Sequence, residues 1–267
     1  MVRLDETTYL AHIERESALF RAALAGCAPD APVPSCPEWT AADLLWHLCT
    51  VQHYWTTMLH QRPKGPDDYA EPERPESYAD LLAHFDAGTP ELVAALRSAR
   101  PEEETWTWKE DDHTAGFICR RQAHEALIHR LDAELAAGRE GRFTDIDPAL
   151  ATDGVEEVLA VMFGGCPSWG TWTGGDTRLR VDCTDTGESI WVRLGHFSGT
   201  SPEGTSYDDD DLHVVPDPGA EPAGVVAGPA AALDAWLWHR GDDSAVIVTG
   251  DPAAYDGFRA AVDHSID

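Results

Sequence analysis

A glutamate and a histidine stand four residues apart in the segment His124-Glu125-Ala126-Leu127-Ile128-His129. In a helix, Glu125 and His129 would meet on one face, where a carboxylate oxygen and an imidazole nitrogen can chelate one ion. The segment is not the His-Glu-x-x-His motif of zinc proteases, because three residues separate Glu125 from His129 and the glutamate itself must be a ligand. The same spacing also occurs in ordinary surface contacts, so a further ligand is needed to favour a metal site.

His47 is the candidate for that further ligand. It lies beside the stripe of Leu44, Leu48 and Val51, so its side chain is expected inside a helical bundle or at its edge. A single histidine there is commonly a hydrogen-bonded core residue, yet the facing helices of bundles also converge on metals. Two histidines and one carboxylate leave coordination positions open, as in catalytic zinc sites, although iron, nickel and copper also accept these ligands. Possible substitutes are His53, His60, His84 and His113.

The composition excludes several classes of partner. The chain has 19 Lys+Arg and 48 Asp+Glu, which gives 19 − 48 = −29. Such a charge repels phosphate backbones and anionic lipids, so neither nucleic acid nor a membrane is an expected partner. No apolar run approaches the roughly 20 residues that span a bilayer, and the first residues lack the pattern of a signal peptide. We therefore expect a cytoplasmic protein.

Two further groups of residues could suggest chemistry but do not. The run Asp208-Asp209-Asp210-Asp211 lacks the alternating acidic spacing and central glycine of an EF-hand, and it is expected to form a solvated loop. The six cysteines contain no C-x-x-C pair, so they are expected to be reduced, with Cys49 and Cys119 as small core residues.

The first half of the sequence predicts four amphipathic helices. The first contains Leu10 to Leu24, and the second opens at Thr40 with a capping-box-like Asp43 and continues to Met58. The third covers about 76–98 with an interruption near Gly88-Thr89-Pro90, and the fourth runs from about 114 to 137 and ends at Gly138. The stretch 32–37 predicts an extended link, and 61–75 predicts a loop. Four helices of this length indicate an antiparallel bundle that brings His47, Glu125 and His129 together.

The pattern changes after Gly138. A helix is predicted over 148–163, a β-hairpin over 179–183 and 189–194, and a Pro/Gly/Asp-rich stretch over 198–224. A helix over 228–238, a strand over 245–249 and a final helix over 252–262 follow. The expected fold class is therefore α+β, with a metal-binding four-helix bundle over 1–142 and a smaller α+β domain over 143–267.

Two sequence motifs and the C-terminal part of the chain resemble those of a known family. The segment Pro34-Ser35-Cys36-Pro37-Glu38-Trp39-Thr40-Ala41-Ala42-Asp43-Leu44-Leu45-Trp46-His47-Leu48 is similar to the first signature of the mycothiol-dependent maleylpyruvate isomerase family, within the DinB-like helical-bundle superfamily. The segment from Arg120 to Glu125, followed by Ile128 to Glu134, resembles the second signature. The tail resembles the C-terminal domain of the family through Trp236-Leu237-Trp238-His239-Arg240 and Val248-Thr249-Gly250-Asp251-Pro252.

The resemblance implies a divalent metal, typically zinc, bound by His47, Glu125 and His129, and mycothiol as a thiol cosubstrate. A metal favours the thiolate of a bound thiol, and thiolate is the nucleophile. In an isomerase the thiolate adds to a cis double bond, the adduct rotates about the resulting single bond, and the thiolate leaves; in a transferase the thiolate stays attached. Family members place an arginine of the C-terminal domain near the active site. Arg240 is the first candidate to bind a substrate carboxylate and Arg193 the second, although an arginine at a helix end is also ordinary.

The sequence also offers candidate residues around the three ligands and more than one possible function. Arg121, four residues before Glu125, is a candidate to contact that ligand, and Trp39 and Trp46 could border the site or belong to the core. The principal hypothesis is a mycothiol-dependent isomerase or S-transferase acting on a small electrophile that carries a carboxylate, as a monomer or homodimer. The alternatives are a metal-dependent hydrolase that uses activated water and a non-catalytic metal- or ligand-binding module.

Overall fold

The computed structural model of the protein describes residues 3–139, 145–264 and 266. The chain divides into two compact units, one formed by Leu4–Arg142 and the other by Phe143–Asp267 with Met1–Arg3. The predicted boundary between 142 and 143 falls among residues 140–144, outside the described residues. The first unit is mainly helical and the second contains a mixed sheet with helices, which confirms the α+β fold class. No described helix combines the length and the apolar composition needed to cross a membrane.

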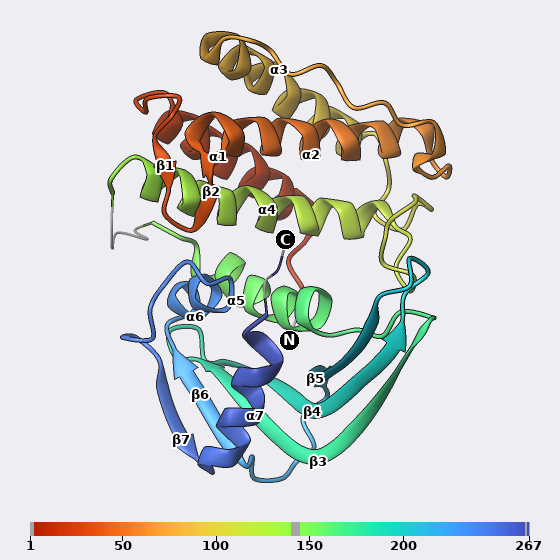
Figure 1. The fold of residues 1–267 in the computed structure, drawn as a ribbon, viewed down its shortest axis with the longest axis vertical. Coiled ribbons are helices and arrows are strands. Elements are labelled where there is room, and N and C mark those ends of the chain that lie inside the picture. Colours follow the sequence, from red (N-terminus) through yellow and green to blue (C-terminus); the bar gives the residue numbers. More distant parts are fainter. Residues whose placement is uncertain (1–2, 140–144, 265, 267) are drawn as a thin grey trace. The chain divides into compact units, whose positions relative to one another are not determined.

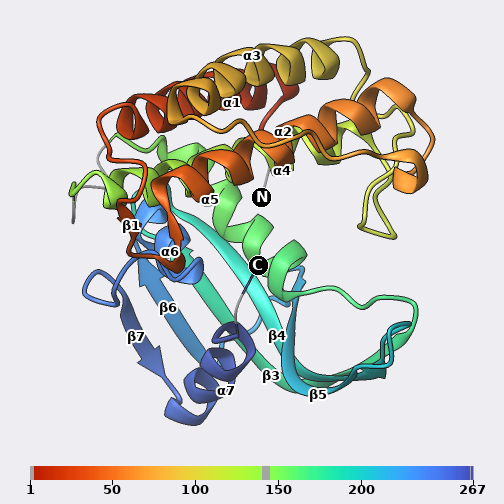
Figure 2. The ribbon, with the colours of Figure 1, turned by 45° about the horizontal axis from the view of Figure 1, so that its top comes forward.

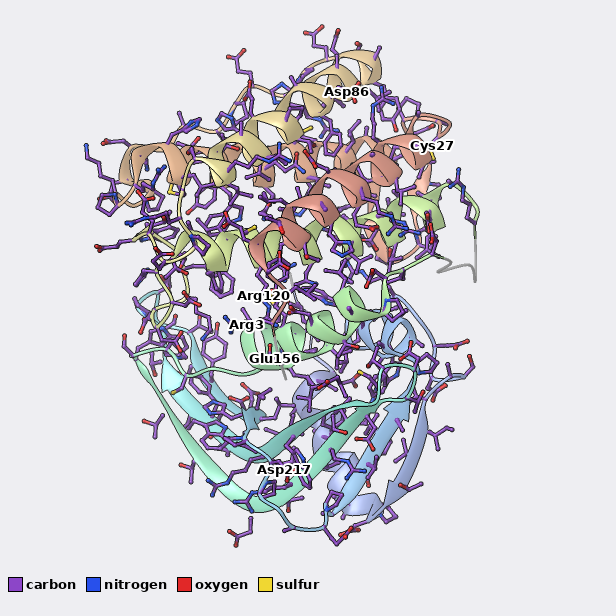
Figure 3. The ribbon with its side chains drawn as sticks, turned by 180° about the vertical axis from the view of Figure 1, so that it is seen from behind. Arg3, Cys27, Asp86, Arg120, Glu156 and Asp217 are labelled. Carbon is purple, nitrogen blue, oxygen red and sulfur yellow. The ribbon has the colours of Figure 1, made fainter. Side chains whose placement is uncertain are left out.

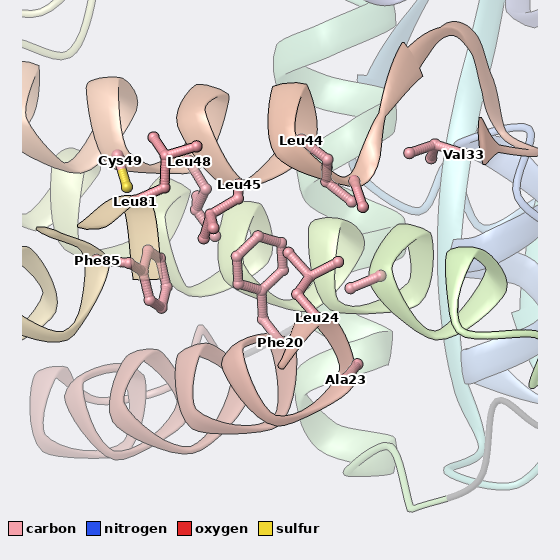
Figure 4. Packing of buried hydrophobic residues seen from close by; sticks show 12 residues of the cluster. Phe20, Ala23, Leu24, Val33, Leu44, Leu45, Leu48, Cys49, Leu81 and Phe85 are labelled. Atoms are coloured by element: carbon pink, nitrogen blue, oxygen red, sulfur yellow. The ribbon is translucent and has the colours of Figure 1, made fainter. Parts of the chain in front are cut away.

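Four long helices build the first unit: α1 (Glu6–Leu24), α2 (Ala41–Gln61), α3 (Tyr78–Arg97) and α4 (Ala115–Ala136). Helix α1 packs against α3 and α4, and α2 packs against the same two helices, so that each helix has two neighbours (Figure 1). Figure 4 shows the apolar side chains between them, where Phe20, Leu44, Leu45 and Leu48 have no exposed surface. This is the bundle that the helical periodicity predicts.

Helix α2 begins where the sequence predicts. The Thr40 hydroxyl accepts a hydrogen bond from the Asp43 amide at 3.3 Å, and the Asp43 carboxylate accepts from the Thr40 amide at 3.0 Å, which completes a capping box. The stretch predicted as an extended link is a short hairpin of β1 (Pro32–Val33) and β2 (Cys36–Thr40), which leads directly into α2. The loop predicted over 61–75 contains one turn of 3₁₀ helix, η1 (Pro66–Asp68).

The predicted interruption of the third helix is wrong, because α3 continues through Pro90. Proline removes one backbone donor from a helix, but neighbouring packing compensates at this position. The Thr89 hydroxyl donates to the Gln52 side chain of α2 at 2.8 Å, and Leu92 and Val93 are buried just beyond the proline. One turn earlier, Asp86, which is labelled in Figure 3, accepts two hydrogen bonds from Arg21 of α1, each at 2.9 Å.

The second unit is built on a five-stranded sheet with the order β5-β4-β3-β6-β7. Its elements are α5 (Pro148–Glu157), which continues as the π-helix η2 (Val158–Phe163), then β3 (Gly170–Cys183), β4 (Glu188–Thr200), β5 (Ser206–Val215), β6 (Gly224–Gly228), α6 (Ala230–Leu237), β7 (Ile247–Gly250) and α7 (Pro252–Val262). Strands β3 and β4 form a long antiparallel hairpin, and β6 is parallel to β3. Figures 1 and 2 show α7 lying across one face of this sheet.

Two predictions for this unit need correction. The hairpin at 179–183 and 189–194 is confirmed, but both strands are longer than predicted. The acidic run at 208–211, predicted as a solvated loop, lies inside strand β5. There it pairs with β4, so that Asp210 lies opposite His196, and the Asp208 carboxylate lies 2.8 Å from a ring nitrogen of that histidine. Cross-strand pairing therefore outweighs the low strand propensity of aspartate.

Candidate metal centre

Three side chains from two helices direct donor atoms to one point in the bundle. His47 comes from α2, whereas Glu125 and His129 come from α4 and lie four residues apart. The Nε2 atoms of His47 and His129 lie 3.4 and 3.1 Å from the same oxygen, Glu125 Oε1. The structure thus brings together the three residues that the sequence selects, with one ligand atom of each within 4.8 Å of the others.

The distances from the two imidazole nitrogens to Glu125 Oε1 fit a small divalent cation. Ligands at about 2.0–2.1 Å from a tetrahedral zinc lie about 3.3–3.4 Å from one another. The two observed nitrogen–oxygen distances, 3.1 and 3.4 Å, are close to that value. The side chain of His47 is 33% exposed, whereas those of Glu125 and His129 are 17% and 9% exposed, so the cluster is open on the His47 side. Three protein donors with one open side allow another molecule to reach an ion held there.

The hairpin before α2 borders the cluster. Trp39 of β2 lies with its ring centroid 4.7 Å from that of His47 and 6.2 Å from that of His129. The two histidine rings are themselves 4.7 Å apart and nearly perpendicular. Of the two tryptophans that the sequence leaves undecided, Trp39 contacts the cluster, whereas Trp46 packs against His84 at 5.7 Å. Trp39 therefore occupies the space beside both imidazoles.

Charge is balanced within the cluster. Burial raises the pKa of Glu125, but the neighbouring charge of His129, hydrogen bonds from His129 and His47, and the charge of Arg121 bring that pKa well below its usual value. Burial lowers the pKa of His129, whereas Glu125 and Asp132 raise it, and the net result is about 9. Glu125 is thus a carboxylate with no proton to lose, which suits a metal ligand.

Further side chains hold the two ligands of α4. Arg121 donates to Glu125 Oε2 at 2.9 Å, as the four-residue spacing predicts, and so leaves Oε1 to face the histidines. Asp132 lies 2.9 Å from Nδ1 of His129, on the side of the ring away from Glu125. Asp132 was not among the residues predicted from the sequence, although its position three residues after His129 places it on the same face of a helix.

Among the described residues, the structure forms no second group of three possible ligands. The substitutes considered from the sequence have other neighbours. His53 packs against Tyr69, with ring centroids 5.9 Å apart, and His84 packs against Trp46. His113 accepts a hydrogen bond from the Thr107 amide at 3.4 Å, and His60 is exposed.

The two candidate arginines lie in the other unit. Arg240 follows the C-terminal end of α6 and donates to the Trp238 carbonyl at 2.7 Å, within its own turn. Arg193 of β4 donates to the carbonyls of Gly175 and Gly174 at 2.6 and 3.1 Å, and its guanidinium lies 5.6 Å from the ring centre of Trp172. Arg193 thus binds the backbone of β3 where its pairing with β4 is irregular, between Gly174 and Arg178. A contact of either arginine with substrate stays a prediction.

The comparisons with known proteins agree with this architecture. Residues 10–134 match the family model described as the mycothiol maleylpyruvate isomerase N-terminal domain, and residues 149–257 match the C-terminal domain of the same enzymes. No curated protein matches the sequence.

Two solved structures share the fold. A crystal structure of the mycothiol-dependent maleylpyruvate isomerase matches with a TM-score of 0.60 at 13% identity. The matched region covers 93% of this chain and 96% of that chain. A histidine-to-alanine mutant of the mycothiol-dependent maleylpyruvate isomerase has a TM-score of 0.63 at 14% identity, with the same coverage. With both family domains present in order along most of its length, the chain belongs to the mycothiol-dependent maleylpyruvate isomerase family.

Proposed function

We propose that the protein is a mycothiol-dependent isomerase in which His47, Glu125 and His129 hold a divalent ion, most simply zinc. The observation that supports this proposal best is the convergence of two imidazole nitrogens on one oxygen of Glu125, at 3.4 and 3.1 Å. Family membership supports the reaction we propose, the isomerisation of maleylpyruvate or of a similar small cis-unsaturated carboxylate with mycothiol as the cosubstrate.

A zinc ion at these residues would lower the pKa of a bound thiol and present it as the thiolate nucleophile. The donor set contributes one negative charge from Glu125 and none from the neutral imidazoles, so the loaded site keeps a positive charge that attracts an anion. Arg121 adds a positive charge behind Glu125, and the Asp132 carboxylate beside His129 offsets it. Trp39 closes the side of the two imidazoles, and the more exposed His47 borders the open side.

The cysteines of the chain support the use of an external thiol. Burial raises the pKa of the Cys49 and Cys119 thiols to about 12 and that of Cys183 to about 11, so these three remain protonated and unreactive at neutral pH. Nucleophilic sulfur at the site is therefore better supplied by a cosubstrate than by these residues.

The substrate carboxylate needs a cation in a protein with a formal charge of −29. Arg240 remains our first candidate, because its guanidinium can bind a carboxylate with two parallel hydrogen bonds. Arg193 of β4 is the second candidate. We expect a soluble cytoplasmic enzyme with a low-molecular-weight thiol as its partner, active as a monomer or homodimer.

The test uses protein loaded with one equivalent of zinc, maleylpyruvate as the substrate, and chromatographic separation of the cis and trans isomers. We expect the trans isomer to form only when mycothiol is present, and mycothiol to be recovered unchanged. A stable S-conjugate of mycothiol and substrate would instead show a transferase. Hydrolysis without mycothiol would show that water is the nucleophile, and either result would refute the isomerase proposal.

A further inference from the structure

Asp132 joins one candidate metal ligand to the hairpin that precedes α2. Its side chain is fully buried, and its two oxygens contact different elements. Oδ2 lies 2.9 Å from His129 Nδ1, and Oδ1 accepts a hydrogen bond of 2.5 Å from the Ser35 hydroxyl. Ser35 stands in the turn between β1 and β2, 97 residues before Asp132 in the sequence.

This arrangement determines which nitrogen of His129 is available to an ion. An ionised carboxylate can only accept hydrogen bonds, so Asp132 requires a proton on Nδ1 of the imidazole. In the neutral ring the lone pair is then on Nε2, the nitrogen that faces Glu125 Oε1 at 3.1 Å. Ser35 donates to the other oxygen of Asp132 and restricts rotation of the carboxylate, which in turn restricts rotation of the histidine ring.

Backbone hydrogen bonds connect the segment that leads into the hairpin with the start of α2. The amides of Ala41 and Ala42, at the start of α2, donate to the carbonyls of Ala31 and Pro29 at 2.8 and 3.0 Å. The hairpin therefore reaches both histidines, His129 through Ser35 and Asp132, and His47 through Trp39. Nothing local in the sequence connects Ser35 with residues of α4.

We propose that Asp132 and Ser35 are positioning residues that fix the tautomer and orientation of His129 for metal binding. This inference rests on the proposed metal site. It assigns the buried aspartate of the His129-Arg130-Leu131-Asp132 segment to the metal centre rather than to packing of the bundle. Carboxylates that hold a ligating histidine in this way contribute about 10- to 100-fold to metal affinity in general.

Glu134 offers a matched control on the same helix. It is also a buried carboxylate, 7% exposed, but it pairs with Arg130 at 3.1 Å rather than with a candidate ligand. Asp132→Asn and Glu134→Gln each remove one buried negative charge from α4 with little change in shape. A purely structural role for Asp132 predicts that both changes lower stability and leave metal affinity alone.

The experiment measures zinc affinity by competition with a chromophoric chelator, in the wild type and in Asp132→Asn, Glu134→Gln, Ser35→Ala and Ser35→Thr. We expect Asp132→Asn to weaken zinc binding by about 10- to 100-fold, and Ser35→Ala by roughly threefold because Asp132 keeps its bond to His129. Ser35→Thr, which retains the hydroxyl, and Glu134→Gln should both bind zinc like the wild type.

A second readout reports directly on the imidazole. In the cobalt-substituted protein, the exchangeable Nδ1 proton of a coordinated histidine gives its own shifted proton resonance. We expect the His129 resonance to exchange slowly with solvent in the wild type and to broaden or disappear in Asp132→Asn. If Asp132→Asn does not fold, the positioning role is tested with Ser35→Ala instead, through its zinc affinity and its rate of Nδ1 proton exchange.

The outcomes separate the inference from the function on which it rests. Wild-type protein without a zinc site would overturn both. Zinc binding that depends on His129 but is unchanged in Asp132→Asn and Ser35→Ala would overturn only the positioning role. Equal losses of affinity in Asp132→Asn and Glu134→Gln would also overturn it, because a general loss of packing would then explain the effect.

Discussion

Replacing Arg130 with methionine should destabilise the helical unit by about 3 kcal/mol. Arg130 on α4 is 2% exposed and Glu16 on α1 is fully buried; their ion pair has an Nη1–Oε2 distance of 2.8 Å, and Glu134 binds the same guanidinium at 3.1 Å. Removing one partner of a buried ion pair typically costs about 3–5 kcal/mol, because the remaining charge is uncompensated. The lower end applies here, since Arg15 still contacts Glu16 at 2.6 Å.

The assay is urea unfolding monitored by far-UV circular dichroism, together with thermal unfolding. For a unit of this size, about 3 kcal/mol corresponds to a decrease in Tm of about 10 °C. The matched control is Arg97→Met, because Arg97 and Glu14 also join two helices but have side chains 57% and 49% exposed. That change should cost less than about 0.5 kcal/mol.

A third variant tests the physical reason rather than the size of the effect. Replacing Glu16, Arg130 and Glu134 together with leucine, methionine and leucine removes the three buried charges, and Arg15, whose side chain is 35% exposed, keeps its access to water. Its free energy of unfolding should lie within about 1 kcal/mol of the wild type, because no buried charge is left without a partner. If Arg130→Met costs no more than Arg97→Met, or if the triple variant is the least stable, this reasoning is refuted.

Three further outcomes follow from single side chains. Burial raises the pKa of Asp211 to about 6. The folded state thus binds the proton of the Asp211 carboxyl more tightly than the unfolded chain does. The contribution of this protonated group to the free energy of unfolding is complete below pH ~4 and is lost as the pH rises through about 6. Asp211→Asn should therefore raise the free energy of unfolding by about 1 kcal/mol at pH 7.5 and by nearly nothing at pH 4; an equal effect at both would contradict the cause. Cys36→Ala should leave zinc content and mycothiol-dependent turnover unchanged, whereas loss of turnover with metal and fold intact would place the nucleophile in the protein. Thr40→Ala should cost about 1 kcal/mol in urea unfolding by removing the capping box of α2, and no loss would show that the cap is dispensable.

The helical unit could be predicted from the sequence because its signals are local. The stripes of apolar residues, the cap at Thr40 and the glycine at 138 act within a few residues, and the helices begin and end close to the predicted positions. Pro90 misled the prediction, because the packing of α3 against α2 tolerates a missing backbone donor that the sequence pattern treats as a break.

The second unit was predicted less completely because strands depend on partners far away in the sequence. Aspartates at 208–211 have low strand propensity, and only their pairing with β4 makes β5. Strand β6 is short and its parallel partner β3 lies about 45 residues earlier, so no local pattern marks it.

The candidate ligands could be selected because residue type and helical spacing restrict them. Glu125 and His129 are placed by their four-residue separation, and His47 by the apolar stripe beside it. Asp132 could have been found by the same rule, at three residues from His129. Ser35 could not, because the hydrogen bond that connects it to Asp132 exists only when the hairpin folds against α4.

Equilibrium titration of the metal-free protein with zinc tests the central claim most directly. The wild type and His53→Ala, which changes a histidine of the same helix outside the cluster, should each bind one zinc ion per chain with equal affinity. His47→Ala and His129→Ala should bind at least tenfold more weakly, because each removes one of three protein donors. Unchanged zinc binding in both of these variants would contradict the account, and would place any metal of this protein elsewhere in the chain.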